Sequence, residues 1–208
     1  SAVKQVSSIV HPLAEGVGWQ SGPHEFLYTA AGTGSFYARD GKSVQYSTVP
    51  GADPEWVDLY LNTQVLVALL HQRGIINFHA SSFTDKGRGI MILGDTGAGK
   101  SSLTLSYVLG GAGFLTDDLT PVIFREEKPT VVPLPRRMKL REGAAQQMNV
   151  DGGLLTDAEA GTGKKYLRVK TAEVADHYLD IVLKIGVGNV SRPEFHEPSP
   201  PEAFSIMR

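Results

Sequence analysis

The stretch that decides the fold is Ile90-Met91-Ile92-Leu93-Gly94-Asp95-Thr96-Gly97-Ala98-Gly99-Lys100-Ser101-Ser102-Leu103. An apolar strand runs into a glycine loop and then into a helix, and the loop matches G-x-x-x-x-G-K-[ST] at every fixed position. Glycines at this spacing let backbone N–H groups close around the β- and γ-phosphates of a nucleotide, and the helix adds its positive N-terminus. We therefore predict a phosphate-binding loop rather than an ordinary glycine turn.

The residues of this loop have expected roles. Lys100 adds a mobile positive charge for the phosphates, and Ser101 faces a magnesium ion shared with the nucleotide. The predicted nucleotide-binding set is Gly94, Asp95, Thr96, Gly97, Ala98, Gly99, Lys100, Ser101 and Ser102. The expected cofactors are ATP and Mg²⁺, with ATP as the default because no base-reading motif is visible.

Composition sets limits on the class of protein. The 208 residues are 41% hydrophobic and 20% charged, which is an ordinary globular composition. The formal net charge of −2 provides no basic field for nucleic acid or an anionic membrane. The absence of cysteine excludes disulfides and thiolate chemistry, and it fits a cytoplasmic protein. No apolar run approaches the roughly 18 residues of a membrane helix, so no membrane partner is expected.

Upstream of the loop we predict a strand-rich extension over residues 1–52, with a loosely held lead-in up to residue 24. Its strands are expected at 26–29, 35–39 and 44–48, and Asp40-Gly41 between the last two is a strong hairpin signal. The sequence thus favours a small antiparallel sheet.

Residues 53–208 are predicted to form the nucleotide-binding domain. Asp53-Pro54 begins a helix that runs to about Gln72 and ends at Gly74. Further elements are strands at 75–83 and 89–93, a helix at 100–109, a strand at 176–185, a mobile loop at 149–164 and a final helix opened by Ser199. The helices at 53–72 and 100–109 are expected to flank a mixed sheet. The chain is expected to continue beyond its last residue.

Two adjacent acids, Asp117 and Asp118, interrupt an apolar stretch after the second helix. One carboxylate there can hold magnesium, and the other can accept a proton from an attacking hydroxyl, a division of labour that phosphoryl transfer requires. The alternative is a pair of acids in a solvated turn. It is disfavoured because Phe114, Leu115 and Leu119 flank the pair, and unpaired carboxylates in apolar surroundings are costly.

The positions of His79, the loop at 94–101 and Asp117-Asp118 resemble the catalytic domain of bacterial HPr kinase/phosphorylase. That enzyme phosphorylates a serine on a carrier protein of the sugar phosphotransferase system, and its fold is related to the ATP-type phosphoenolpyruvate carboxykinases. The resemblance covers residues 65–125 and implies an α/β fold with a phosphate loop and a mixed sheet of that type. It implies that Lys100 contacts the phosphates, Ser101 and Asp118 hold the metal, Asp117 is the general base and His79 lies beside the reacting phosphate.

Two departures narrow what the resemblance implies. The separate N-terminal domain of the family has no counterpart, and neither does its long downstream motif for the phosphorylase reaction and carrier docking. The segment at 134–141 resembles a branch of HPr-kinase-like proteins, some of them encoded beside peptide-tailoring genes. A serine kinase acting on another protein or peptide, rather than on HPr itself, is therefore implied. Because classical relatives are hexamers, a homo-oligomer is possible.

Two basic segments have open interpretations. Arg137, Lys139 and Arg141 alternate with apolar residues, so they form either a solvated strand edge or a contact for phosphate or an acidic substrate. The segment 161–165 imitates a second phosphate loop but lacks a preceding strand, and it is either a solvated turn or a loop that closes over nucleotide. His79 taken alone fits a structural strand histidine as well as a catalytic one.

Three functions remain in competition. The favoured one is an ATP- and Mg²⁺-dependent kinase acting on a serine or other hydroxyl of a protein or peptide. A nucleotide-sensing regulatory module needs one metal-holding acid and has no use for Asp117 as a second. A small-molecule kinase differs only in its acceptor pocket. The sequence identifies neither the acceptor, nor ATP over GTP, nor a phosphorylase or phosphatase activity, nor the oligomeric state.

Overall fold

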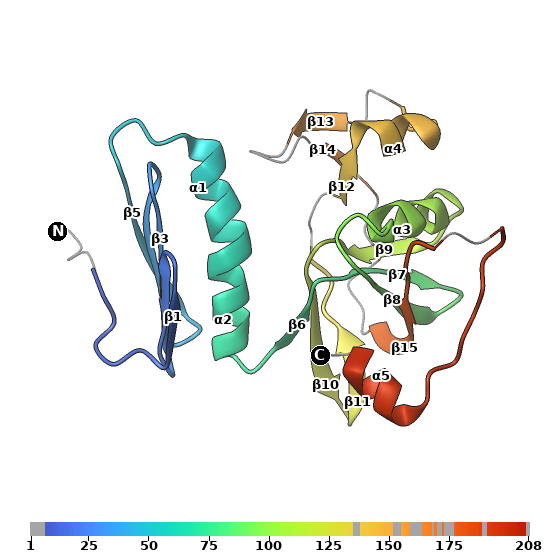
Figure 1. Cartoon of the computed structure of the whole chain (residues 1–208), viewed down its shortest axis with the longest axis horizontal. Helices are drawn as coiled ribbons and strands as arrows, with labels where there is room; N and C mark the ends of the chain where they lie inside the picture. The colour runs from blue at the N-terminus through green and yellow to red at the C-terminus, as the bar shows by residue number, and fades with distance from the viewer. Residues whose placement is uncertain are drawn as a thin grey trace.

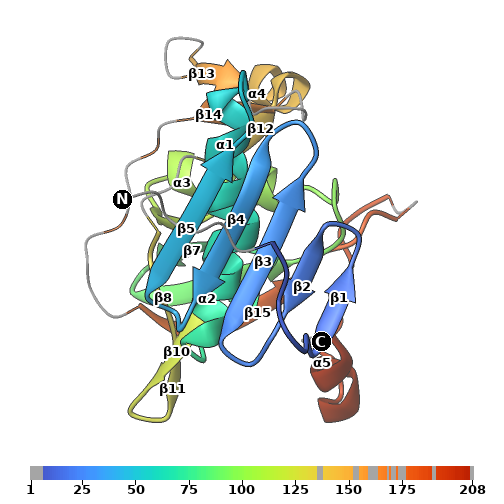
Figure 2. The same cartoon turned by 90° about the vertical axis from the view of Figure 1, so that its left-hand side faces the viewer.

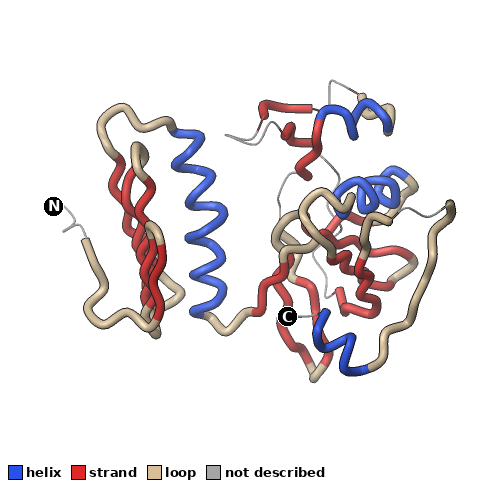
Figure 3. The backbone as a smooth tube through the Cα atoms, viewed as in Figure 1, coloured by secondary structure: helices blue, strands red, loops and turns tan. Residues whose placement is uncertain are grey.

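The computed structural model describes residues 7–134, 138–151, 155–158, 164–167, 169, 172, 177–188 and 191–206. These residues form helices and strands in an α/β architecture with three β-sheets (Figures 1 and 3). A five-stranded sheet lies at the N-terminal end of the chain, a seven-stranded mixed sheet carries the glycine loop, and a three-stranded sheet lies beside it. The predicted α/β class is confirmed.

The N-terminal sheet is an antiparallel meander of five strands in sequence order (Figure 2). The predicted hairpin is confirmed, and Asp40 and Gly41 adopt φ of 55° and 63° in its turn. The expectation of a loose lead-in is wrong, because two short strands around Gly18, at φ 77°, pair with each other and with the next strand. The strands are β1 Ala14–Gly16, β2 Trp19–Ser21, β3 Glu25–Ala30, β4 Gly34–Arg39 and β5 Ser43–Thr48.

The predicted helix at 53–72 exists as α1 Pro54–Tyr60, a π-helical turn η1 Leu61–Val65 and α2 Leu66–Gln72. The Asp53 side chain caps its start by accepting from the Glu55 N–H at 2.9 Å. The prediction that this helix flanks the glycine-loop sheet is wrong. It packs on the N-terminal sheet and lies between that sheet and the rest of the molecule (Figure 1).

An aromatic row explains this packing. Tyr28, Phe36 and Tyr46 are paired across β3, β4 and β5, so their side chains share one face, and the Tyr60 ring of the helix covers two of them. Burying these rings against the helix removes apolar surface from water and stabilises the packing of the helix on this sheet. The predicted domain boundary at residue 53 thus separates the helix from the sheet against which it packs.

Replacing Phe36 with alanine is expected to lower the free energy of unfolding by about 3–5 kcal/mol. The ring is fully buried and lies 5.8 Å from the Tyr60 ring and 6.0 Å from the Tyr46 ring. Urea unfolding measures the loss, with Phe124→Ala as the control because Phe124 is 64% exposed. A loss below about 1 kcal/mol, close to that of an exposed position, would contradict the role of Phe36 in this core.

The seven-stranded sheet has the order β6-β10-β11-β15-β8-β7-β9, with only β8 and β15 parallel among its neighbouring pairs. The predicted strand at 75–83 is two strands, because the chain leaves β10 at His79-Ala80 and continues beside β8 and β9. The strand predicted at 176–185 is confirmed. The strands are β6 Ile76–Phe78, β7 Ser81–Asp85, β8 Arg88–Leu93, β9 Gly113–Thr116, β10 Thr120–Arg125, β11 Lys128–Val131 and β15 His177–Lys184.

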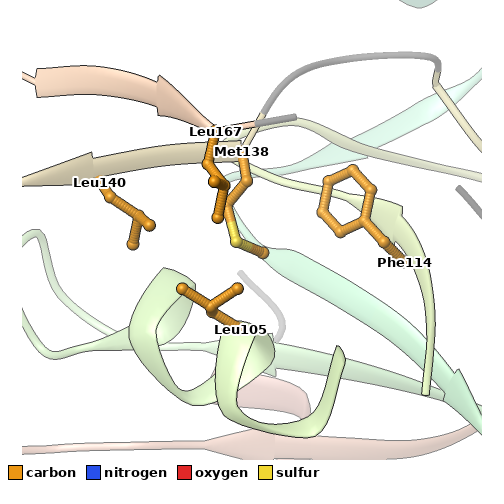
Figure 4. Close-up of a cluster of buried hydrophobic side chains, with 5 residues drawn as sticks. All are labelled: Leu105, Phe114, Met138, Leu140 and Leu167. Atoms are coloured by element: carbon orange, nitrogen blue, oxygen red, sulfur yellow. The ribbon is translucent and has the colours of Figure 1, made fainter. Parts of the chain in front are cut away.

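Helix α3, Lys100–Leu109, follows β8 as predicted and packs against strands of both the large and the small sheet. The small sheet consists of β12 Met138–Arg141, β14 Lys164–Leu167 and β13 Leu155–Ala158, with α4 Glu142–Gln147 after β12. Strand β13 lies within the segment predicted as a mobile loop, so that prediction is wrong for residues 155–158. The sheet is fixed by a buried cluster of Leu105, Phe114, Met138, Leu140 and Leu167 (Figure 4).

The last helix, α5 Pro200–Ile206, begins where the sequence predicted it. Glu202 accepts from the Ser199 backbone N–H at 2.8 Å and from its hydroxyl at 2.7 Å, and Ile206 packs against the buried Ala80, Met91, Leu93 and Val122. None of the helices in the described ranges has the length and apolar character needed to cross a bilayer.

Candidate functional site

The glycine loop, residues 94–101, joins the C-terminal end of β8 to the first turn of α3. Gly97 and Gly99 have φ of 86° and 98°, which favours glycine, and a Cβ on either would meet no atom within 4 Å. Their backbone therefore faces open space on the side of the cleft. Lys100 is 8% exposed, and its Nζ donates to the carbonyl oxygens of Gly94 at 2.7 Å and Asp95 at 3.2 Å.

Asp117 lies at the end of β9, opposite the start of α3, and is 3% exposed. Its Oδ1 accepts from the Ser101 hydroxyl at 2.8 Å and its Oδ2 from the Lys139 backbone N–H at 2.9 Å. Burial raises the pKa of the Asp117 carboxyl, and these two hydrogen bonds offset only part of that effect. The site therefore holds a buried carboxyl beside a hydroxyl. A nearby positive charge would stabilise the ionised form of this carboxyl.

Asp118 has different partners. Its Oδ2 accepts from Lys139 Nζ at 2.8 Å, and its Oδ1 lies 3.3 Å from His79 Nδ1. Burial by itself would raise the pKa of this carboxyl, but the hydrogen bond and charge of Lys139, aided by His79, hold the pKa below its usual value. The Asp118 carboxylate is therefore ionised at neutral pH, and its side chain remains 27% exposed.

His79 occupies the break between β6 and β7, where the chain passes from one half of the large sheet to the other. Its Nδ1 lies 3.1 Å from the backbone carbonyl oxygen of Asp118 as well as near the carboxylate, and its side chain is 56% exposed. The imidazole thus borders the cleft and contacts the second acid.

A chain of buried hydroxyls holds the turn that carries both acids. Thr116 Oγ1 lies 2.6 Å from Ser82 Oγ and 2.6 Å from Thr120 Oγ1, and the Thr120 hydroxyl donates to the Ala80 carbonyl at 3.1 Å. All three hydroxyl residues are fully buried. The turn itself places Asp118 at φ 71°, an unusual value for a residue other than glycine. The network therefore fixes where the two carboxylates lie, and sequence reasoning missed it.

The glycine loop, His79, the two acids and Lys139 line one cleft of about 290 Å³. Of the predicted site residues, His79, Thr96, Gly97, Gly99, Lys100, Ser101, Ser102, Asp117 and Asp118 line it. Gly94, Asp95 and Ala98 do not line it. The described residues contain no cluster of three His, Cys, Asp or Glu side chains able to hold a metal.

The structure differs from the implied pairing at one point. The Ser101 hydroxyl is bonded to Asp117, whereas the resemblance implied that Ser101 and Asp118 share the metal. Sequence analysis also left Lys139 and Arg141 undecided, and both line the cleft, together with Lys164. Lys164 lies on β14, so within 161–165 its position corresponds to a strand rather than a turn. Arg137 and residues 161–163 lie outside the described residues.

Comparisons with known proteins do not assign the chain to a family. No protein-family model matches the chain, and no curated protein matches it. The solved structures that match include the HPr(Ser) kinase/phosphatase from Coxiella burnetii, at 17% sequence identity and a TM-score of 0.36. The alignment covers 59% of this chain and 66% of that one. A likeness at this level assigns neither a family nor an activity.

Replacing Asp117 with asparagine is expected to stabilise the metal-free protein by about 1 kcal/mol at pH 7. A raised pKa in the folded state means that wild-type stability falls as the pH rises above the ordinary aspartate value of 3.8, whereas the amide does not ionise. The advantage of the variant should therefore shrink as the pH falls toward 4. Urea unfolding at both pH values, with exposed Asp58→Asn as control, measures the difference. A variant less stable than wild type at pH 7 would show that the Asp117 charge is well compensated.

Proposed function

We propose that the protein is a Mg²⁺-dependent phosphotransferase that moves the γ-phosphate of ATP to a serine or other hydroxyl of a protein or peptide. The observation that carries this proposal is the division of partners between the adjacent acids. Asp117 is buried against Ser101 of the glycine loop, while Asp118 faces the same cleft and is paired with Lys139. A nucleotide sensor needs the first arrangement only.

The oxygen donors at Asp117 fit magnesium. The Ser101 hydroxyl and the Asp117 carboxylate are hard ligands 2.8 Å apart, and Mg²⁺ commonly takes one or two such protein groups and completes its shell with phosphate and water. The raised pKa of the Asp117 carboxyl is the property of a group whose charge a divalent cation would stabilise. We therefore assign the metal to Ser101 and Asp117, exchanging the two acids relative to the roles that the resemblance implied.

Asp118 is then the general base. Its carboxylate takes the proton of the acceptor hydroxyl, the acceptor oxygen forms a bond to the γ-phosphorus, and the bond from that phosphorus to the β–γ bridging oxygen breaks to release ADP. Lys139 and His79 orient the carboxylate, and Lys100 neutralises charge on the transferring group. Magnesium, if held by Ser101 and Asp117, would neutralise part of the charge of the phosphates.

The charge of the cleft agrees with an uncharged acceptor group. Four cations, Lys100, Lys139, Arg141 and Lys164, line it together with two carboxylates, which leaves a formal charge of +2 with histidine counted as neutral. The magnesium complex of ATP carries about −2 and would balance it. A neutral hydroxyl therefore fits the remaining position better than an acidic group.

The experiment is transfer of radiolabelled γ-phosphate from ATP, with Mg²⁺, to lysate proteins, to HPr and to small hydroxyl compounds, each as a separate acceptor. A labelled protein or peptide band that requires magnesium is the expected result. Label on small molecules alone would support phosphotransfer but show that the acceptor is a small hydroxyl compound and not a protein or peptide. Tight ATP binding without transfer to any acceptor would favour the regulatory module instead.

A further inference from the structure

The small sheet presents a basic face to the cleft, opposite the glycine loop. Arg141 on β12 is paired in register with Lys164 on β14, and residues paired across strands project from the same face. Lys139 is two positions before Arg141 on β12 and so shares that face. All three side chains line the cleft, and we call them the basic wall.

The basic wall has a rigid support. Met138 and Leu140 alternate with its residues on β12 and project from the other face, where they pack with Leu167 on Leu105 of helix α3 (Figure 4). Met138 is fully buried and Leu140 is 2% exposed. Since α3 begins in the glycine loop, one helix supports both sides of the cleft and fixes the distance between them.

The cleft offers little for a nucleobase. None of the described residues that line it carries a phenyl, phenol or indole ring, and the aliphatic residues that border it are Ala144 and Leu140, whose side chain packs on the opposite face of β12. Base recognition normally uses apolar or aromatic surface with a few placed polar groups. Besides His79 and the two carboxylates, the lining consists mainly of cations, hydroxyls and open glycine backbone, which are ligands for phosphate oxygens.

We propose that the basic wall and the glycine loop form a two-sided clamp on the polyphosphate chain, so that the site selects its phosphoryl donor by the triphosphate and not by the base. This inference rests on the proposed function and answers which donors that site accepts. Arg141 supplies a planar fork suited to two phosphate oxygens, and Lys164 supplies a point charge beside it. Lys139 is largely engaged with Asp118 and contributes less.

Binding of ATP, GTP and inorganic tripolyphosphate, each with Mg²⁺, tests the selectivity by titration calorimetry on the whole chain. The expected dissociation constants for ATP and GTP lie within about threefold of each other, and tripolyphosphate binds within about tenfold of ATP. A preference of 30-fold or more for one base, or no binding of tripolyphosphate where ATP binds, would overturn the clamp.

Two adjacent lysines provide a matched test of the basic wall. Lys164→Ala and Lys165→Ala each remove one positive charge, but Lys165 pairs with Leu140, projects from the other face and makes an ion pair with Glu142 at 3.1 Å. Lys164→Ala and Arg141→Ala are each expected to weaken ATP and tripolyphosphate binding by about tenfold, and Lys165→Ala by less than twofold. Equal effects of Lys164→Ala and Lys165→Ala would show that the lysines act only through the overall positive potential of the protein. That result would refute the clamp.

Failure of the clamp and failure of the proposed function give different results. If ATP binding by the wild type depends on Lys100 but not on Arg141 or Lys164, the clamp is wrong and the phosphotransferase stands. If neither nucleotide nor tripolyphosphate binds to the wild type, both fall. If tripolyphosphate and nucleotides bind as expected but no acceptor is labelled, the clamp stands and the transfer reaction does not.

Discussion

Replacing Asp118 with asparagine is expected to lower the rate of phosphoryl transfer by about 10³-fold. The amide keeps the size of the side chain but accepts no proton from the acceptor hydroxyl. Affinity for ATP should stay the same or rise, because Lys139 loses its negatively charged partner at 2.8 Å and becomes more available to phosphate. Single-turnover transfer and calorimetric titration with ATP separate the two effects.

The matched control for this variant is Asp58→Asn on the exposed side of helix α1, which removes one carboxylate far from the cleft. The sharper comparison is with Asp117→Asn. We expect that variant to need far more magnesium for transfer, since it loses the proposed metal ligand. If Asp117→Asn abolished transfer at every magnesium concentration while Asp118→Asn transferred normally, Asp117 would be the base, as the resemblance implied.

Replacing Lys100 with alanine is expected to weaken ATP binding by about 100-fold. In the proposed complex the lost ammonium would make charge-assisted hydrogen bonds to phosphate in a largely buried position, where such bonds are strong. Arginine at this position should not restore affinity, because the Lys100 ammonium contacts two backbone carbonyls as a point donor, and a planar guanidinium cannot reproduce that geometry. Calorimetry on both variants measures this, with Lys86→Ala in the exposed β7–β8 turn as control.

The pH dependence of binding gives an independent test of Lys100. Burial lowers the pKa of its ammonium from the ordinary value of 10.5, and the charges of Asp118 and Asp117 offset part of this effect. Only the protonated form attracts phosphate, so ATP affinity should fall as the pH rises, and this fall should begin below pH 10.5. Wild-type affinity that stays constant to pH 10.5, or normal affinity in Lys100→Ala, would contradict the assignment.

Local patterns predicted much of the fold correctly. The strand, glycine loop and helix around residues 90–109 depend on residues close together in the chain, and so do the hairpin at Asp40-Gly41 and the Asp53 cap. Failures came where a short segment depends on a distant partner. Strands β1 and β2 are only three residues each and gain their stability from pairing, and β13 forms because β14 is beside it.

The candidate site divides in the same way. The sequence by itself determined the presence of the glycine loop, Lys100, Ser101 and the two acids, because their spacing along the chain carries the chemistry. Only the tertiary structure decided that Ser101 bonds to Asp117, that Lys139 holds Asp118, and that Arg141 and Lys164 face the loop. An alternating strand such as 138–141 fits a solvated edge as well as a cleft wall. The apolar face of this strand packs on α3, and its basic face is therefore directed toward the cleft. Such contacts between distant segments determine where each face of a strand points.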